Sequence, residues 1–238
     1  MPTTHILAFD VYGTILNTGS IAGSLKEHLN ISTDKANAIS TLWRTYQLEY
    51  TWRLNSMGLY ESFHKVTRKS LLHAALDHGF DLQPAIAFDI CEAYWKLTPY
   101  PDALDTLKSL NELPNVQVVV FSNGTKEMIS SAMDAASLSP LIHTQFLADS
   151  VQKYKPMPDI YRGLVDFLGK SEDSERVYLV SGNPFDVTGA RSAGLSAIWV
   201  DRAGKGWHDR LFDVKKVGPT HTVRGLKDIS ALVQSFQS

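Results

Sequence analysis

Short apolar runs recur along the chain, and each is followed at once by a polar residue. The runs cover residues 6–9, 116–121, 146–148, 177–180 and 197–200. They are rich in Val, Ile and Phe and are largely apolar on both faces. This pattern is typical of strands in a parallel sheet that helices cover on each side.

Helix-like stretches lie between the runs, at residues 102–113, 126–136, 158–168 and 184–193. Such alternation of strand and helix predicts an α/β fold with a doubly wound, mainly parallel sheet. In sheets of this kind, ligands bind outside the carboxyl ends of the strands. Because Asp10, Ser122 and Ser181 each follow an apolar run, we expect them to meet at one edge of the sheet.

One long segment breaks this alternation. From about residue 20 to residue 97 no strand pattern occurs, and four helical patterns take its place. The longest runs from about residue 32 to residue 55 and has Asp34 in its first turn, where the helix dipole favours negative charge. We therefore expect an all-helical cap subdomain at residues 17–97, inserted into a core formed by residues 1–16 and 98–238.

Composition and charge narrow the classes of partner. Lys and Arg number 23 against 25 Asp and Glu, so the chain offers no general attraction to nucleic acid or to an anionic membrane. The single cysteine, Cys91, permits neither an intrachain disulfide nor a thiolate cage, and the eight histidines form no ligand pairs. We predict no metal site and no cofactor. The first ten residues carry neither a basic segment nor a long apolar run, so we expect a cytoplasmic protein.

Asp10 follows a predicted strand and precedes the turn Gly13-Thr14. A carboxylate held in this way is suited to nucleophilic attack, although a strand-end aspartate is also a common turn cap. Ser122 and Asn123 open a predicted helix, where a hydroxyl and unpaired amides can bind an anion. The alternative is that one of them only caps the helix.

Lys155 precedes Pro156, which favours an extended backbone at the start of a loop. A lysine there can fix a carboxylate or balance the charge of Asp10, or it can be an ordinary surface residue. Asp186 falls near the first turn of a predicted helix, where the dipole keeps it ionised and able to act as a base. It can also be simple charge at a helix start.

Taken together, four segments resemble the core motifs of the haloacid dehalogenase superfamily, and most closely its L-2-haloacid dehalogenase branch. They are Asp10-Val11-Tyr12-Gly13-Thr14, Ser122-Asn123-Gly124, Tyr154-Lys155-Pro156 and Ser181-Gly182-Asn183-Pro184-Phe185-Asp186. The segment at residues 43–52 is similar to a signature of that branch. The resemblance covers nearly the whole chain and fades after about residue 203.

Tyr12 distinguishes this chain from the phosphatases of the superfamily, which carry a second aspartate at that place. The last motif begins Ser181-x-Asn183 and lacks the further acidic residues that would bind magnesium for phosphoryl chemistry. The sequence therefore favours a small carboxylic acid over a phosphate ester as substrate.

The resemblance implies a catalytic role for nine residues. Asp10 would attack C2 of a 2-haloacid and form an ester, while Arg44 on the cap would receive the halide. Asn183 and Asp186 would position and activate a water that hydrolyses the ester. Substrate carboxylate would lie near Ser122, Lys155 and the amides around Asn123. Thr14, Tyr161 and Ser181 would hold Asp10, Lys155 and the water in place.

Further residues are expected around the substrate. Tyr12, Leu48, Phe63 and Phe185 look like pocket walls, in addition to Asn123. Phe185 stands where the branch usually has Trp, Gly182 where Ser is common and Thr45 where Gln is common. The resemblance also implies a homodimer formed through the cap. Two alternatives remain: hydrolysis of another C–X bond, as in fluoroacetate or a strained cyclic amino acid, and a non-enzymatic interaction protein.

Overall fold

The computed structural model describes residues 4–237 and has a six-stranded parallel sheet at its centre. The strands are β1 (His5–Phe9), β2 (Val116–Ser122), β3 (Gln145–Leu147), β4 (Val177–Ser181), β5 (Ser196–Val200) and β6 (His221–Val223). Their order across the sheet is β3-β2-β1-β4-β5-β6, and every neighbouring pair is parallel. All five residues of β1 are buried, because this strand lies in the middle of the sheet.

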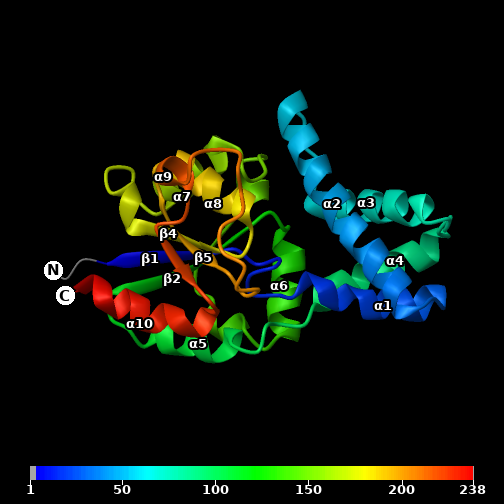
Figure 1. Ribbon diagram of the computed structural model, residues 1–238, viewed down its shortest axis with the longest axis horizontal. Helices are drawn as coiled ribbons and strands as arrows, with labels where there is room; N and C mark the ends of the chain where they lie inside the picture. Colours follow the sequence, from blue (N-terminus) through cyan, green and yellow to red (C-terminus); the bar gives the residue numbers. More distant parts are fainter. Residues whose placement is uncertain (1–3, 238) are drawn as a thin grey trace.

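Helices cover both faces of the sheet, which confirms the predicted doubly wound α/β fold. They are α5 (Ala103–Asn111), α6 (Lys126–Ala135), α7 (Pro158–Phe167), α8 (Pro184–Ser192), α9 (Val214–Val217) and α10 (Ile229–Gln234). Figure 1 shows α7 and α8 on one side of the sheet and α5 and α10 on the other. The predicted elements agree with these bounds to within one or two residues.

The segment between β1 and α5 is entirely helical, as the sequence indicated. It contains η1 (Thr18–Ile21), α1 (Ala22–Leu29), α2 (Thr33–Met57), α3 (Phe63–Asp77), α4 (Pro84–Ala93) and η2 (Tyr94–Lys96), and we call it the helical insertion. Figure 1 shows α1 to α4 gathered beyond one end of the sheet. The subdomain boundaries 17–97 and 1–16 with 98–238 stay predictions.

Helix α2 is the longest element of the helical insertion, and both of its ends follow from the sequence. The side chain of Ser32 caps the first turn by accepting from the Lys35 amide, and Asp34 lies in that turn as predicted. Gly58 ends the helix in the left-handed conformation, with φ of 66°. No helix within residues 4–237 combines the length and the apolar character needed to cross a bilayer.

The two chain segments that join the helical insertion to the sheet run side by side. The Asn17 amide donates to the Thr98 carbonyl at 2.8 Å, and the Tyr100 amide donates to the Ile15 carbonyl at 2.9 Å. This pairing fixes the entry and the exit of the helical insertion next to the turn that follows β1.

Candidate active site

Asp10 lies directly beyond the carboxyl end of β1 and is only 6% exposed. Its Oδ2 accepts from Thr14 Oγ1 at 2.7 Å and from Asn183 Nδ2 at 2.8 Å. Its Oδ1 accepts from Lys155 Nζ at 3.2 Å. The two oxygens are therefore unequal: Oδ2 is fixed by two donors, whereas Oδ1 keeps electron pairs for another atom.

Lys155 is buried, with 1% of its surface exposed, so it is not an ordinary surface lysine. Its Nζ donates to Asp10 Oδ1 at 3.2 Å, to Asp186 Oδ2 at 2.8 Å and to the Phe121 carbonyl at 2.8 Å. An ammonium has three hydrogens, and each of these has an acceptor. Of the two functional roles expected for Lys155, the geometry favours balancing Asp10 over binding a substrate.

Asp186 lies in the first turn of α8, as predicted, but its side chain is fully buried. Besides Lys155, it accepts from Tyr161 Oη at 2.7 Å. Tyr161 was expected beside Asp10, Lys155 or the water, and it contacts Asp186 instead. Burial raises the pKa of the Asp186 carboxyl, the Lys155 ammonium lowers it, and nearby Asp10 raises it, with a net rise from 3.8.

Ser122 is the last residue of β2, and its Oγ accepts from the Gly124 amide at 3.1 Å. This leaves the Ser122 hydroxyl hydrogen for another acceptor. Asn123 Oδ1 accepts from the Lys155 amide at 3.0 Å. The side-chain cap of α6 is Thr125, so neither Ser122 nor Asn123 serves as the plain helix cap that was the alternative reading.

The segment after β4 supports Asp10 from a second side. Asn183 Nδ2 donates both to Asp10 Oδ2 and, at 3.0 Å, to the Tyr12 carbonyl, while Ser181 Oγ accepts from the Asn183 amide at 3.1 Å. The Gly182 amide donates to Thr14 Oγ1 at 2.9 Å. A Cβ on Gly182 would lie 2.6 Å from the Gly13 carbonyl oxygen, so this chain needs glycine where the branch often has serine.

Arg44 of α2 reaches the same place from the helical insertion. Its Nη2 donates to the Tyr12 carbonyl at 3.4 Å, and its Nη1 donates to Gln47 Oε1 at 2.7 Å. The Tyr12 carbonyl thus accepts from Arg44 and from Asn183, which also holds Asp10. Arg44 and Asp10 therefore meet at one site, although they come from opposite parts of the molecule.

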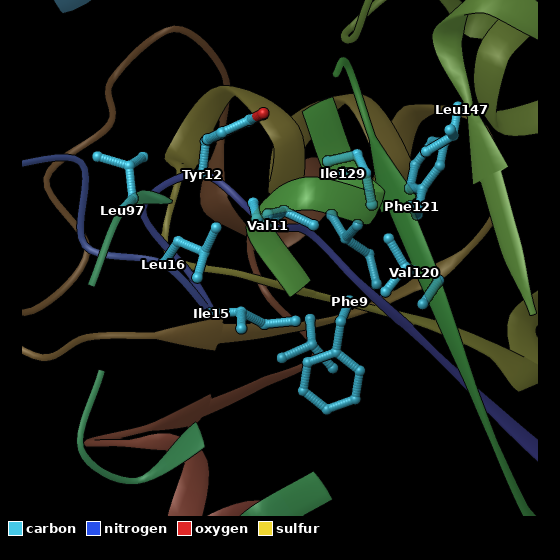
Figure 2. Packing of buried hydrophobic residues seen from close by; sticks show 14 of the residues in the cluster. Phe9, Val11, Tyr12, Ile15, Leu16, Leu97, Val120, Phe121, Ile129 and Leu147 are labelled. Carbon is cyan, nitrogen blue, oxygen red and sulfur yellow. The ribbon is translucent and has the colours of Figure 1, made fainter. Parts of the chain in front are cut away.

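Three of the four expected pocket walls lie on or beside this site. Tyr12 and Phe63 are buried and pack together with a ring separation of 5.5 Å. Figure 2 shows the Tyr12 hydroxyl directed away from Phe9 and Ile15, which lie deeper in the core. Phe185 of α8 meets Trp52 of α2 edge to face at 5.6 Å, so it joins the core to the helical insertion.

The fourth expected wall, Leu48, is half-buried on α2, one turn after Arg44. Thr45 is exposed, and its hydroxyl donates to the Thr41 carbonyl of the same helix at 3.0 Å. Arg44 and Leu48 thus share a face of α2 that Thr45 does not.

Sequence reasoning missed the buried polar group that fixes Arg44. Gln47 is fully buried, and its Oε1 accepts from Arg44 and, at 3.1 Å, from Tyr94 Oη. Its Nε2 donates to Thr67 Oγ1 at 2.7 Å. A signal existed, because Gln47 follows Trp43 by one helical turn on the buried stripe of α2.

No group of three or more His, Cys, Asp or Glu side chains within residues 4–237 is arranged to hold a metal ion. Metal independence stays a prediction. The acidic residues at the site are Asp10 and Asp186, and both face the Lys155 ammonium.

The chain matches one protein family and is similar in sequence to several known enzymes. The family model for haloacid dehalogenase-like hydrolases matches residues 4–194. An (S)-2-haloacid dehalogenase from Pseudomonas sp. (strain YL) is 32% identical over 232 residues, which cover 98% of this chain and 94% of the relative. An (S)-2-haloacid dehalogenase 4A from Burkholderia cepacia is 33% identical over 196 residues, or 82% of each chain.

Among solved structures, the L-2-haloacid dehalogenase from Xanthobacter autotrophicus with chloropropionic acid covalently bound superposes with a TM-score of 0.86. It is 28% identical, and the match covers 98% of this chain and 99% of that one. These comparisons confirm the family resemblance and the expectation of an enzyme. They do not favour the alternatives of another C–X bond or of a non-enzymatic interaction protein.

Proposed function

Because the chain belongs to the haloacid dehalogenase-like hydrolase family, we propose that it hydrolyses small (S)-2-haloacids to 2-hydroxyacids and halide through an ester on Asp10. One observation carries this proposal. A buried carboxylate has one oxygen fixed and the other available, and Asn183, which holds it, shares the Tyr12 carbonyl with a guanidinium from the helical insertion.

In the first step Asp10 acts as the nucleophile. An electron pair on Oδ1 forms a bond to C2 of the substrate, and the C2–halogen bond breaks with its pair leaving on the halide. Displacement at saturated carbon requires nucleophile, carbon and leaving group in line, so the configuration at C2 inverts. Thr14 and Asn183 hold Oδ2, which keeps Oδ1 aimed at the substrate.

Arg44 receives the departing halide. It reaches the Tyr12 carbonyl from α2, so its guanidinium enters the site from the helical insertion. Its charge stabilises the anion that develops as the C2–halogen bond breaks, and the covering helices strengthen this attraction by excluding water. Gln47 keeps the guanidinium in place.

In the second step a water molecule attacks Cγ of the Asp10 ester and gives a proton to Asp186. The bond between Cγ and the ester oxygen then breaks, and the leaving oxygen takes the second proton of the water, which releases the 2-hydroxyacid and restores the carboxylate. Asp186 returns its proton to solvent before the next cycle. Asp186 is suited to this task because burial raises its pKa towards the working range of a general base. Tyr161 and Lys155 fix its orientation.

The substrate carboxylate binds at the start of α6. Ser122 can donate its hydroxyl hydrogen, and the amides around Asn123 lie at a helix N-terminus, where anions are stabilised. The three hydrogens of Lys155 are already donated to Asp10, Phe121 and Asp186, so the proposed mechanism assigns it no contact with the substrate carboxylate. Tyr12, Leu48, Phe63 and Phe185 form the apolar surroundings of the C2 substituent.

A comparison of wild type with Asp10→Asn on (S)-2-chloropropionate tests the reaction. Wild type should release chloride without added metal and in the presence of a chelator, and Asp10→Asn should release none. A single turnover in heavy-oxygen water should place the label in the Asp10 peptide. Label found only in the hydroxyacid would show direct attack by water and would overturn the ester mechanism.

The homodimer is a separate proposal. Met57 and Leu59 at the end of α2 and Leu76 on α3 are each more than half exposed, a distribution that suits burial by a second copy through the helical insertion. Gel filtration with light scattering tests this, and a monomer at micromolar concentration would contradict it. The cytoplasmic location stays a prediction.

A further inference from the structure

Tyr154 belongs to the loop before α7, yet its side chain is enclosed by the helical insertion. It is fully buried, and its ring packs on Tyr60 at 5.3 Å and on Phe63 at 6.0 Å. Its hydroxyl donates to the Glu61 carbonyl at 2.5 Å. Nearby, Tyr60 donates a hydrogen bond to Asp149. The loop that carries Lys155 is thus anchored in the helical insertion.

Asn55, in the last turn of α2, holds the backbone of this loop at two points. Its Nδ2 donates to the Tyr154 carbonyl at 2.7 Å, and its Oδ1 accepts from the Tyr154 amide at 3.0 Å. A side-chain amide that bonds to both the N–H and the C=O of one residue fixes the backbone of that residue in position and in orientation. The two residues are 99 positions apart in the chain.

Lys155 is the next residue, and it is held from the other side by the core. Its amide donates to Asn123 Oδ1, and its Nζ lies between Asp10 and Asp186. We propose that Asn55 is a positioning residue of the reaction: by clamping Tyr154, it places the Lys155 ammonium between the nucleophile and the base. The inference rests on the proposed function for its kinetic consequences.

A shift of Lys155 would act on Asp186 with a definite sign. Asp186 faces Lys155 from the loop before α7, Tyr161 from α7 and Asp10 from the end of β1. Among these groups only the Lys155 ammonium carries positive charge, and it lowers the pKa of the carboxyl. If the ammonium moves away, the pKa of Asp186 should rise. Asp186 would then be protonated, and unable to act as a base, at pH values where it is ionised in wild type.

The experiment compares Asn55→Ala with Asn111→Ala. Asn111 makes a similar bond, from Nδ2 to the Leu141 carbonyl at 2.9 Å, but lies at the end of α5, away from the site. In Asn55→Ala we expect kcat to fall about tenfold while KM stays within about twofold, because the catalytic groups are misplaced and not removed. The acid limb of kcat should move to higher pH. Asn111→Ala should change neither.

Asn55→Asp separates the two bonds. It keeps the acceptor for the Tyr154 amide and loses the donor to the Tyr154 carbonyl. Its kcat and the acid limb of its pH profile should therefore lie between those of wild type and Asn55→Ala. It also serves if Asn55→Ala does not fold. If Asn55→Ala and Asn55→Asp lose only thermal stability and keep the wild-type pH profile, Asn55 is merely structural and the inference is wrong.

A second readout does not depend on turnover. Carbon-13 labelling of the aspartate carboxyls, with Asp186→Asn for assignment, reports the protonation of Asp186 by NMR. The pH at the midpoint of the Asp186 titration should rise in Asn55→Ala and stay unchanged in Asn111→Ala. If wild type releases no halide, the proposed function fails, and this titration still decides whether Asn55 positions Lys155.

Discussion

The two oxygens of Asp10 differ because their donors differ, and in the proposed mechanism this asymmetry selects the oxygen that reacts. Thr14 and Asn183 both donate to Oδ2, and both are themselves fixed by the segment after β4. Hydrogen bonds lower the basicity of the oxygen that accepts them. Oδ1, with a single long bond to Lys155, is therefore the better nucleophile.

Thr14→Val tests this division. Valine matches threonine in shape but cannot donate to Asp10 or accept from the Gly182 amide. A hydrogen bond to a charged acceptor contributes about 1.5–3 kcal/mol, so kcat should fall at least tenfold. Thr14→Ser keeps the hydroxyl and should retain most of the activity. Equal kcat in Thr14→Val and wild type, measured by halide release, would refute the role of this bond.

The raised pKa of Asp186 predicts how the rate of the second step depends on pH. A base acts only when ionised, and burial, the largest cause, raises the pKa of this carboxyl above 3.8 against the opposing effect of Lys155. Asp10 adds to the rise only in the free enzyme, because the ester carries no charge. As pH falls through the raised pKa, the rate of ester hydrolysis should drop at a higher pH than it would with a solvated aspartate as the base. Quenched-flow measurement of the ester under single-turnover conditions follows this step alone.

Asp186→Asn extends the same argument. The amide cannot accept the proton of the attacking water, so halide should appear in one stoichiometric burst while the ester persists on Asp10. Mass spectrometry of the intact protein would detect the added acyl group. Steady turnover in this variant would mean that another group activates the water.

The sequence placed Asp186 and Lys155 at the site but could not assign their contacts. Tyr154-Lys155-Pro156 predicts an extended residue, and nothing in the tripeptide tells that the ammonium turns inward to three acceptors. Those acceptors come from three different segments of the chain. Pairing of this kind depends on tertiary packing, which local pattern does not contain.

At the scale of elements, the sequence predicted strands and helices well where each is long and clearly apolar or amphipathic. The strand β6 was missed because it contains no apolar run: only Val223 is buried, and Thr222 is exposed. Its pairing with β5 depends on the sheet already being formed. The four helices of the helical insertion were recognised because no strand pattern interrupts them.

Helix α2 links the packing of the helical insertion to the chemistry. Its buried stripe contains Trp43 and Gln47, and Gln47 joins Arg44 to Tyr94 and Thr67. A hydrophobic helix face with one buried amide is costly unless every polar atom is satisfied, as it is here. The amide therefore serves to hold the guanidinium and not to fill space.

Gln47→Leu should lower both stability and activity. It leaves Tyr94 and Thr67 without this partner, so the free energy of unfolding should fall by about 2 kcal/mol. Arg44 loses its fixed position, so kcat for halide release should fall as well. Gln47→Glu keeps the acceptor for Arg44 and is the matched control. Urea unfolding and halide assays measure the two effects, and unchanged kcat in Gln47→Leu would contradict the linkage.

At the scale of the whole molecule, Arg202 ties the core to both ends of the helical insertion. Its guanidinium forms two bonds to Asp102, at 3.0 and 2.9 Å, donates to the Thr14 carbonyl at 3.2 Å and stacks on Tyr100 at 3.9 Å. Asp102 also accepts from the Leu226 amide at 2.8 Å. Arg202 and Asp102 together thus connect the turn after β1, the return from the helical insertion and the C-terminal segment.

Arg202→Met should destabilise the protein more than an ordinary arginine substitution. Arg202 and Asp102 are 23% and 18% exposed, so the pair is largely shielded from water, and its loss should cost about 2 kcal/mol of unfolding free energy. Arg210→Met, on an exposed loop residue, should change little. Chemical denaturation compares the two, and equal midpoints would show that the contacts of Arg202 are not needed.

In the buried trio of Asp10, Lys155 and Asp186, one lysine side chain pairs with two carboxyl groups. Esterification of Asp10 would remove its charge and leave Lys155 paired with Asp186 alone. The Asp10 charge is one of the causes that raise the pKa of Asp186, and it would be absent in the ester, when Asp186 has to act as the base. In each catalytic cycle the pKa of Asp186 would therefore fall when the ester forms and rise again when the product leaves.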